Sequence, residues 1–434
     1  MNLFALAQER AAAGRPVRVG LIGAGKFGSM FLAQVPSSPL EVTAIADLDP
    51  DRARQACRQV GWDAARIEAT AFHSDAAALL ERADVDVVVE ATGNPVVGVE
   101  HALACFDAGK HLVAVNVEAD ALVGPRLAVA ARHAGVVYSL AYGDQPALIC
   151  ELVDWARACG FEVVAAGKGT KHHSTYHAST PATVWDHYGL TAAQAADAGM
   201  NSQMFNSFLD GTKSAIEMAA VANATGLTPA PDGLSFPPCG VDDLPHVLRP
   251  ATAGGRLHHK GQVEVVSCLE GDFRPVFRDL RWGVYVVIEA PTDYAAACFA
   301  QYGLRTDASG RYAAMYKPYH LIGLELNVSV LSAALRGEPT GAPTGWRADV
   351  VATAKRDLRA GEVLDGEGGF TVYGRLQPAA DSLALGGLPL GLAHGVELRA
   401  DVAAGDPVRW GDVILKEEGA AHRLRRELEQ AGPA

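Results

Sequence analysis

The glycine-rich turn that follows the first apolar stretch constrains this chain more than any other feature. Residues 17–22 are typical of a buried strand, and the turn over residues 23–28 opens a helix through Met30 to Gln34. Between them, Gly23, Gly25 and Gly28 form the pattern G-x-G-x-x-G. In this context the first glycine permits a tight turn, the second lets the backbone approach a pyrophosphate, and the third lets helix and strand pack closely. The helix N-terminus then faces the anion, so the pattern predicts a dinucleotide-binding loop.

An acidic residue in the next strand bears on which dinucleotide this loop binds. Asp47 ends that strand, 19 residues after Gly28. A carboxylate there accepts hydrogen bonds from a ribose 2′-hydroxyl and repels a 2′-phosphate, which favours NAD. Arg52 or Arg54 can instead turn toward a phosphate, so NADP stays open.

Two further turns follow apolar strands. Thr92, Gly93 and Asn94 come after the strand pattern at 85–90, and Asn116 follows the next strand along the chain. Open α/β sheets bind ligands at the carboxyl ends of their strands, which predicts contact with the cofactor; turn chemistry alone is the alternative explanation. The full set of residues expected at the cofactor is Gly23, Ala24, Gly25, Lys26, Phe27, Gly28, Asp47, Thr92, Gly93, Asn94 and Asn116.

The order of strand and helix patterns predicts an α/β chain in three parts. Residues 1–146 alternate short apolar strands with helices, which indicates a doubly wound parallel sheet of the Rossmann type. Residues 147–344 have the pattern of an α+β catalytic domain with its polar residues in loops. Residues 345–434 carry short strands separated by glycine, which is typical of a small β-rich module.

Composition excludes several classes of protein. The formal net charge of −13 argues against nucleic acid or an anionic membrane surface as a partner, although a few local cations suffice for an anionic substrate. The seven cysteines are scattered and include no C-x-x-C, which indicates reduced thiols and neither a disulfide framework nor a zinc site. Glu9 and Arg10 interrupt the first apolar stretch, so we expect no signal peptide. Arg126 and Arg132 break the most apolar window, so we expect no membrane span. With reduced thiols, these features lead us to expect a cytoplasmic protein.

The segment from Phe205 to Ala219 is the best candidate for catalytic chemistry. Asp210, Lys213 and Glu217 are spaced i, i+3 and i+7, so all three can share one helix face. A lysine held between two carboxylates can donate a proton to a developing alkoxide. The alternative is an ordinary ladder of salt bridges on the protein surface.

A second polar segment, 168–177, follows a predicted strand and is rich in Gly, Thr and His. Lys168, Lys171 and His172 suit a phosphate or carboxylate group of a substrate. A metal site and a solvated loop are the alternatives, and no second set of metal ligands at a reliable spacing accompanies the histidines.

Taken together, these motifs resemble a known family. The stretches V-G-L-I-G-A-G-K-F-G and V-V-V-E-A-T-G-N-P resemble the nucleotide domain of homoserine dehydrogenases, and residues 210–216 resemble their catalytic helix. The phrase at 354–364 and its echo at 400–408 resemble the SAF module, a small β-clip domain. In this order, the three parts resemble the deoxyxylulose-phosphate reductoisomerase-like enzymes, which are built on a homoserine-dehydrogenase scaffold.

The resemblance implies site residues and also shows departures from true homoserine dehydrogenases. Those enzymes have an A-N-K signature whose lysine contacts the substrate. The run from Val115 to Ala119 resembles this signature but has a carboxylate, Glu118, in place of the ammonium group. The resemblance therefore implies that Glu118 lies at the substrate. The aspartate precedes the catalytic lysine by three residues, against four in that family. The SAF-like module replaces a regulatory tail, so homoserine itself is a doubtful substrate.

We therefore expect an oxidoreductase dependent on NAD(P)(H) that acts on a CH–OH group of a small anionic carbonyl or polyol compound. A skeletal rearrangement would precede hydride transfer if the resemblance extends to activity. Asp47 favours NAD whereas the resemblance favours NADPH; no metal site is expected from the residues, and dependence on a divalent metal stays open. The catalytic candidates are Lys213, Asp210 and Lys171, and the substrate-binding candidates are Lys168, His172 and Glu118. We also expect a homo-oligomer.

Three other functions stay open at this point. One is homoserine dehydrogenase activity. Another is a non-catalytic nucleotide sensor, in which the cofactor site controls binding of a partner. The last is a lyase or dehydratase that uses the SAF-like part, which would require a set of metal ligands.

Overall fold

The structure, a computed structural model, describes residues 2–415 and 419–434. The chain forms two compact units, and each unit is assembled from separate stretches of sequence. The first comprises Met1–Leu148 and His320–Thr344, and the second Ile149–Tyr319 and Gly345–Ala434. The division into 1–146, 147–344 and 345–434 stays a prediction, and it did not include the return of residues 320–344 to the first unit.

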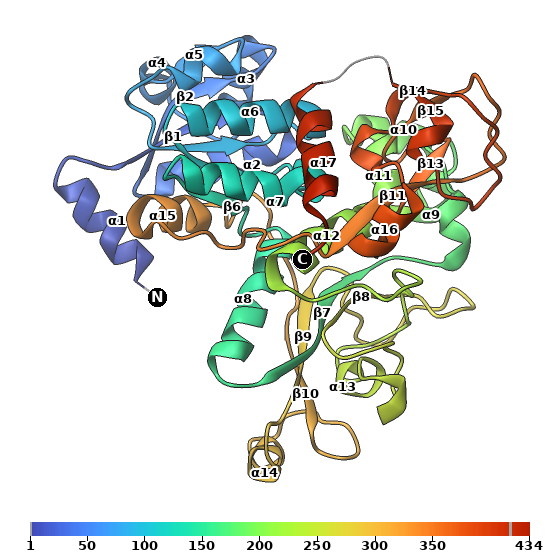
Figure 1. Cartoon of the computed structure of the whole chain (residues 1–434). Helices are drawn as coiled ribbons and strands as arrows, with labels where there is room; N and C mark the ends of the chain where they lie inside the picture. Colours follow the sequence, from blue (N-terminus) through green and yellow to red (C-terminus); the bar gives the residue numbers. More distant parts are fainter. Residues whose placement is uncertain (1, 416–418) are drawn as a thin grey trace. The chain divides into compact units, whose positions relative to one another are not determined.

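The first unit is built on a parallel six-stranded sheet with the order β3-β2-β1-β4-β5-β6. This is the strand order of dinucleotide-binding Rossmann folds, with its switch point between β1 and β4. The predicted α/β class and the parallel sheet are thereby confirmed. The strands are β1 Val17–Ile22, β2 Leu40–Ala46, β3 Ala71–His73, β4 Val87–Glu90, β5 His111–Ala114 and β6 Tyr138–Leu140. Figure 1 labels the strands β1, β2 and β6 of this sheet.

Helices follow the strands of this sheet in alternation. Side chains cap several of them; Asp49 accepts hydrogen bonds from the amides of Asp51 and Arg52, and Pro50 occupies the first helical position of α3. The helices are α1 Leu3–Ala12, α2 Lys26–Gln34, α3 Pro50–Gln59, α4 Ala64–Ala69, α5 Ala76–Leu80, α6 Pro95–Asp107 and α7 Val117–His133, with a short 3₁₀ turn η1 at Val35–Ser37. Helix α8, Gln145–Ala158, crosses into the second unit.

The segment that returns to the first unit contributes to its core. Helix α15, Asn327–Arg336, packs against β1, β4, β5 and β6. Val330 of this helix, and Leu326 directly before it, belong to the same buried apolar cluster as Val19 and Leu21 of β1. Residues 321–335 have a helical pattern within the expected central domain, but the helix begins only at Asn327 and packs on the Rossmann sheet.

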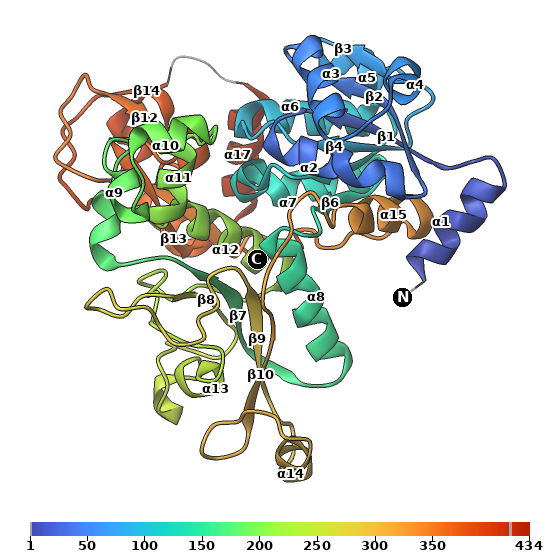
Figure 2. The same cartoon turned by 180° about the vertical axis from the view of Figure 1, so that it is seen from behind.

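The second unit contains three sheets. A mixed four-stranded sheet has the order β10-β9-β7-β8, in which only β7 and β8 run parallel, and α14 lies at the tip of the β9–β10 connection (Figure 2). Two small antiparallel sheets, β11-β13 and β12-β14-β15, come from the C-terminal stretch. The strands are β7 Glu162–Thr170, β8 Gln262–Ser267, β9 Val284–Glu289, β10 Tyr312–Lys317, β11 Ala348–Ala354, β12 Val363–Asp365, β13 Val372–Pro378, β14 His394–Leu398 and β15 Val413–Ile414.

The long helix α12 forms the centre of this unit, because it packs against β8 on one side and against β11 and β13 on another. The helices are α9 Val184–Tyr188, α10 Ala192–Asp197, α11 Ser202–Leu209, α12 Thr212–Thr225, α13 Leu244–Val247, α14 Asp293–Gln301, α16 Ala379–Leu385 and α17 Ala420–Ala431. Short 3₁₀ turns are η2 Ser174–Ala178, η3 Ala251–Ala253, η4 Leu390–Leu392 and η5 Trp410–Asp412.

Two expectations for this unit need correction. The helical pattern of residues 203–225, which suggests one helix, forms two, because Gly211 adopts a left-handed φ of 91° and separates α11 from α12. The polar loop predicted from Lys168 begins later, because β7 continues through Thr170 and buries Lys168 in the sheet. Within residues 2–415 and 419–434, no helix has both the length and the apolar character needed to cross a membrane.

Candidate functional site

The glycine loop has the geometry that the spacing of its three glycines predicts, and each glycine has a different role. Gly23 has a φ of 94°, and a methyl group there would lie 2.8 Å from the carbonyl oxygen of Ala91. A methyl group at Gly28 would lie only 2.3 Å from the carbonyl oxygen of Gly23. At Gly25, by contrast, a methyl group would meet no protein atom within 4 Å. The loop is therefore closed at its first and third glycines, where protein atoms leave no room for a side chain, and open at its second glycine, which has free space beside it.

The open glycine is also the N-cap of α2. Gly25 precedes the first helical residue, Lys26, and both are exposed, whereas Ala24 is buried and Phe27 packs on the core of the unit. The unpaired amides of the first helical turn thus lie next to open space. An anion is favoured at such a position by the amides and by the helix dipole.

Asp47 lies beside this loop and is fixed by it. One carboxylate oxygen, Oδ2, accepts a hydrogen bond from the amide of Ala24 at 2.9 Å; the other, Oδ1, accepts from the amide of Asp49 at 3.0 Å and from Arg52 at 2.7 Å. Burial alone would raise the pKa of Asp47, but these bonds outweigh it and lower the pKa below its ordinary value. Asp47 is therefore ionised at neutral pH, with an arginine already paired to it.

The residues after β4 and β5 serve first as helix caps. The side chain of Asn94 accepts hydrogen bonds from the amides of Val96 and Val97 at the start of α6. Asn116 caps α7 by accepting from the amide of Ala119, and its side-chain nitrogen donates to the carbonyl of Asn94 at 2.8 Å. This cross-link holds the two turns together at the carboxyl edge of the sheet.

Between these caps and the sheet lies a buried carboxylate that the sequence did not single out. Glu90 ends β4 and accepts hydrogen bonds from the amide of Thr92 at 3.2 Å and from its hydroxyl. Thr92, Gly93 and Asn94 are themselves exposed, and Glu118 is half-buried in the first turn of α7.

In the second unit, Asp210, Lys213 and Glu217 do not share one helix face, contrary to the prediction. Asp210 ends α11 and precedes α12, so only Lys213 and Glu217 share that helix. Both carboxylates are buried, Asp210 at 0% and Glu217 at 2% exposure, which rules out a surface ladder. Each carboxylate instead pairs with a lysine distant in sequence: Asp210 with Lys355, and Glu217 with Lys168.

These pairings change what the predicted substrate-binding residues can do. Lys168 is buried against Glu217, so its charge is already neutralised. His172 is also buried and stacks on Phe236 with ring centroids 3.8 Å apart. Burial, helped by the nearby His177, lowers the pKa of His172 to about 3, so this ring is neutral at physiological pH and supplies no charge to an anion.

Lys171 is the one of the three expected cations that stays half-exposed. Its ammonium donates to the carbonyl of His187 and lies 5.2 Å from the centre of the Tyr188 ring. The guanidinium of Arg281 lies 6.0 Å from the same ring. Burial first, and the neighbouring Arg281 second, lower the pKa of Lys171. Arg281 comes from the segment before β9, and no local pattern in the sequence linked it to Lys171.

A small cavity lies on the other side of α12. It has a volume of about 230 Å³ and is lined by Gly211, the N-cap of α12, and by Ala215 of the helix itself. Residues two positions apart on a helix point in nearly opposite directions, so Lys213 lies on the face of α12 opposite to Ala215 and this cavity. Its other lining residues include His177, Phe236, Tyr373 and Arg375.

Within the described part of the chain, no group of three or more His, Cys, Asp or Glu side chains is placed to hold a metal ion. The cysteines described there are all free, as the sequence predicted.

Comparison with known proteins gives a domain match for each of the three parts. The oxidoreductase family with an NAD-binding Rossmann fold (GFO_IDH_MocA) matches residues 17–115, the catalytic domain of the oxidoreductase DRL matches residues 143–326, and the SAF domain matches residues 349–414. The matched domains are those of an NAD-binding oxidoreductase, which confirms the predicted class together with the SAF module.

Individual relatives resemble only parts of the chain. A homoserine dehydrogenase from Neisseria gonorrhoeae is 32% identical over 112 residues, which is 24% of this chain and 23% of that protein. An NAD-binding oxidoreductase from Klebsiella pneumoniae is 25% identical and covers 38% of this chain and 44% of its own, with a TM-score of 0.29. A myo-inositol dehydrogenase from Lactobacillus casei is 19% identical and covers 39% of this chain and 49% of its own, with a TM-score of 0.30. The chain thus spans about a quarter of the curated relative and about half of each of these structures.

Proposed function

We propose that this protein is an NAD(P)-dependent oxidoreductase that acts on a CH–OH group of a small, anionic, hydroxylated carbonyl or polyol compound. The observation that carries the proposal is the glycine loop, which is closed against the protein at Gly23 and Gly28 and open at Gly25. The domain matches over residues 17–115 and 143–326 support the same class.

The residues of the first unit fit a nicotinamide dinucleotide. The open space at Gly25 and the free amides of α2 suit a pyrophosphate, and the Asp47 carboxylate suits a ribose hydroxyl. When bound, such a cofactor supplies a hydride acceptor or donor at its nicotinamide ring. The polar turns after β4 and β5, tied together by Asn116, would line the carboxyl edge of the sheet where ligands of this fold lie.

In the second unit, Lys213 is our candidate for moving the proton on the substrate oxygen. It occupies the first turn of α12, and its side chain is only partly buried. An ammonium group there would supply the proton that an alkoxide formed by hydride addition requires. Asp210 acts in this scheme through the backbone before α12 rather than as the direct partner of Lys213.

The anionic end of the substrate is assigned to Lys171 together with Arg281. Both cations face the ring of Tyr188, and burial first, then the neighbouring Arg281, lower the pKa of Lys171; a bound anion would counter both effects. Lys168 and His172, which we expected to share this role, are both buried. The charge of Lys168 is neutralised by Glu217, and the His172 ring is neutral. Glu118 remains a candidate for a hydroxyl of the substrate, because its carboxylate suits a hydrogen-bond donor.

Two versions of this proposal name a more specific substrate. The reductoisomerase-like resemblance implies a sugar phosphate whose skeleton rearranges before hydride transfer, with cations stabilising an enediolate-like intermediate. The short match to a homoserine dehydrogenase favours homoserine as the second candidate. Glu118, in place of a lysine, argues against the second candidate.

A substrate screen tests the proposal directly. The protein is incubated with NAD or NADP and a panel of polyol phosphates, sugar acids and homoserine, and with NADH or NADPH and sugar phosphates, while the absorbance of the reduced nicotinamide is followed. We expect turnover with at least one anionic hydroxylated compound. Binding of the dinucleotide without any hydride exchange across the panel would instead favour a nucleotide sensor.

Cofactor choice depends on Asp47. Replacing it in Asp47→Ser removes the repulsion of a 2′-phosphate and frees Arg52 to pair with that phosphate. We expect the ratio of NADP to NAD affinity to rise about tenfold, or about 1.4 kcal/mol. Dissociation constants from nicotinamide fluorescence measure this ratio, and Asp49→Ser, which keeps a capping oxygen two residues away, is the control. An unchanged ratio would show that Asp47 does not contact the ribose.

Loss of Lys171, which we assign to the anionic end of the substrate, should change the Michaelis constant more than the turnover. Lys171→Met should raise the Michaelis constant for an anionic substrate about tenfold while turnover stays within about twofold, because a uniform binding contact is lost. Lys260→Met, which removes a half-exposed ammonium paired with Glu289 in the same unit, is the control. A normal Michaelis constant with collapsed turnover would move Lys171 from binding to chemistry.

A further inference from the structure

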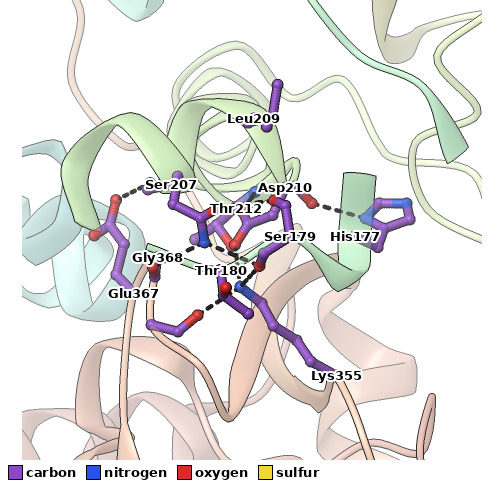
Figure 3. A network of polar contacts seen from close by, with 12 residues as sticks. His177, Ser179, Thr180, Ser207, Leu209, Asp210, Thr212, Lys355, Glu367 and Gly368 are labelled. Carbon is purple, nitrogen blue, oxygen red and sulfur yellow. Dashed lines mark hydrogen bonds and ion pairs between the residues drawn. The ribbon is translucent and has the colours of Figure 1, made fainter. Parts of the chain in front are cut away.

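Lys355 lies at the centre of a buried polar network that the proposed chemistry does not use. It directly follows β11, within the stretch that matches the SAF domain, and its side chain is 2% exposed. Its ammonium donates to the carbonyls of Ser179 and Gly369, both at 2.7 Å, and pairs with Asp210 at 2.8 Å (Figure 3). An ammonium has three protons to donate, so all three are engaged.

Asp210 transmits this contact to the start of α12. Its Oδ1 accepts a hydrogen bond from the amide of Thr212 at 2.9 Å, while Oδ2 faces Lys355. Its carbonyl accepts a hydrogen bond from His177 Nδ1 at 2.7 Å. The N-cap of α12 is Gly211, which has no side chain to cap the helix, so Asp210 supplies the capping oxygen in its place.

Three further contacts tie the same corner to the SAF stretch. The hydroxyl of Thr212 accepts a hydrogen bond from the amide of Gly374 at 2.8 Å. Asn206 of α11 donates to the carbonyl of Gly368 at 2.9 Å, and Ser207 donates to Glu367 at 2.5 Å (Figure 3). The turn between α11 and α12 is thus held from the SAF stretch at several points.

Stability alone is a poor explanation for the central ion pair. Burying two charges costs several kcal/mol of solvation each, and apolar replacements of similar volume are often as stable. What a buried pair with saturated hydrogen bonds does provide is one fixed geometry for the groups attached to it. Here those groups are the amide of Thr212 and the first turn of α12, which carries Lys213.

We propose that Lys355 is a positioning residue for Lys213: the SAF stretch fixes, through Lys355 and Asp210, the first turn of the helix that carries the catalytic lysine. This inference rests on the proposed function for the role of Lys213. Lys355 itself does not transfer protons to substrate, since it is buried and its three protons are occupied. The SAF stretch is on this account part of the catalytic machinery.

The test compares two buried ion pairs, each of which has one partner in the SAF stretch. Lys355→Met breaks the pair with Asp210, and Arg425→Met breaks the equally buried pair between α17 and Asp349 of β11. Hydrogen exchange of the amides in residues 210–216 is measured by mass spectrometry on the full chain. The turnover number and Michaelis constants are measured with the best substrate from the screen.

We expect Lys355→Met to speed exchange of residues 210–216 at least about tenfold and to lower turnover at least about tenfold, with Michaelis constants within about twofold. Arg425→Met should change the exchange of residues 210–216 and the turnover by less than about twofold, even if it lowers the melting temperature as much as Lys355→Met does. If Lys355→Met does not fold, Lys355→Met with Asp210→Asn leaves no unpaired charge and keeps the capping oxygen; its exchange and turnover should still differ from wild type in the same direction.

The outcomes separate this inference from the proposed function. Unchanged exchange in residues 210–216 would overturn the positioning role, whatever the activity. Faster exchange with wild-type turnover, in a protein that Lys213→Met inactivates, would overturn the link to catalysis. Wild-type turnover in Lys213→Met would overturn the proposed role of Lys213, while the exchange result would still report whether Lys355 holds the helix.

Discussion

Lys213→Met should lower turnover at least about 100-fold, the usual scale for losing a positioned proton donor. Methionine keeps the length and helix propensity of lysine but removes the charge and the protons. Binding of the nicotinamide cofactor should survive, because the glycine loop belongs to the other unit. Steady-state kinetics and cofactor fluorescence measure the two quantities on the same sample.

Two further variants make this result specific. Lys213→Arg keeps a positive charge but holds its proton too tightly to transfer it, so it should be nearly as impaired as the methionine variant. Lys260→Met removes a lysine elsewhere in the unit and should leave turnover intact. Near wild-type turnover in a folded Lys213→Met protein would contradict the proton-transfer role.

Gly25→Ala should separate cofactor binding from folding. A methyl group at Gly25 meets no protein atom within 4 Å, so the loss of stability should not exceed the cost of alanine at an N-cap, about 1 kcal/mol. The same methyl group occupies the space through which a pyrophosphate approaches, so cofactor affinity should fall at least about tenfold. Thermal denaturation and fluorescence titration measure the two effects.

Gly28→Ala is the matched comparison, with an expected loss of both properties. Its methyl group would lie 2.3 Å from the carbonyl oxygen of Gly23, and a backbone atom cannot turn aside. We expect a loss of about 1–3 kcal/mol in stability and a fall in affinity of about 100-fold, because the whole loop must shift. Full cofactor affinity in Gly25→Ala would show that the open side of the loop does not hold the dinucleotide.

Much of the first unit was predictable because its signals are local. The strand, the three glycines and the helix lie within one short stretch. The observed β1 matches the predicted range, and α2 ends at Gln34 as predicted but begins at Lys26, inside the predicted turn. Asn94 and Asn116 were predicted as turn residues or cofactor contacts, and their capping bonds confirm the turn chemistry. Their contact with cofactor stays a prediction. Leu326 and Val330 join this core from far along the chain, which no local periodicity indicates.

The second unit was harder to predict because its decisive contacts are distant in sequence. The spacing of Asp210, Lys213 and Glu217 suggested one charged helix face, yet each carboxylate pairs with a lysine from another segment. Helical spacing describes neighbours on one helix and cannot show which strand packs against it. Lys355 lay in a phrase that indicated the SAF module, and nothing in that phrase indicated a buried partner for Asp210.

The most direct test of the central claim is isotope transfer from substrate to cofactor. The compound with the fastest turnover is supplied with deuterium on its carbinol carbon, and the reduced nicotinamide is isolated and analysed by mass spectrometry and NMR. The proposed oxidoreductase predicts one deuterium per molecule, on one face of nicotinamide C4. Release of the label to water with an unlabelled cofactor would contradict hydride transfer, and would point to a lyase or dehydratase reaction.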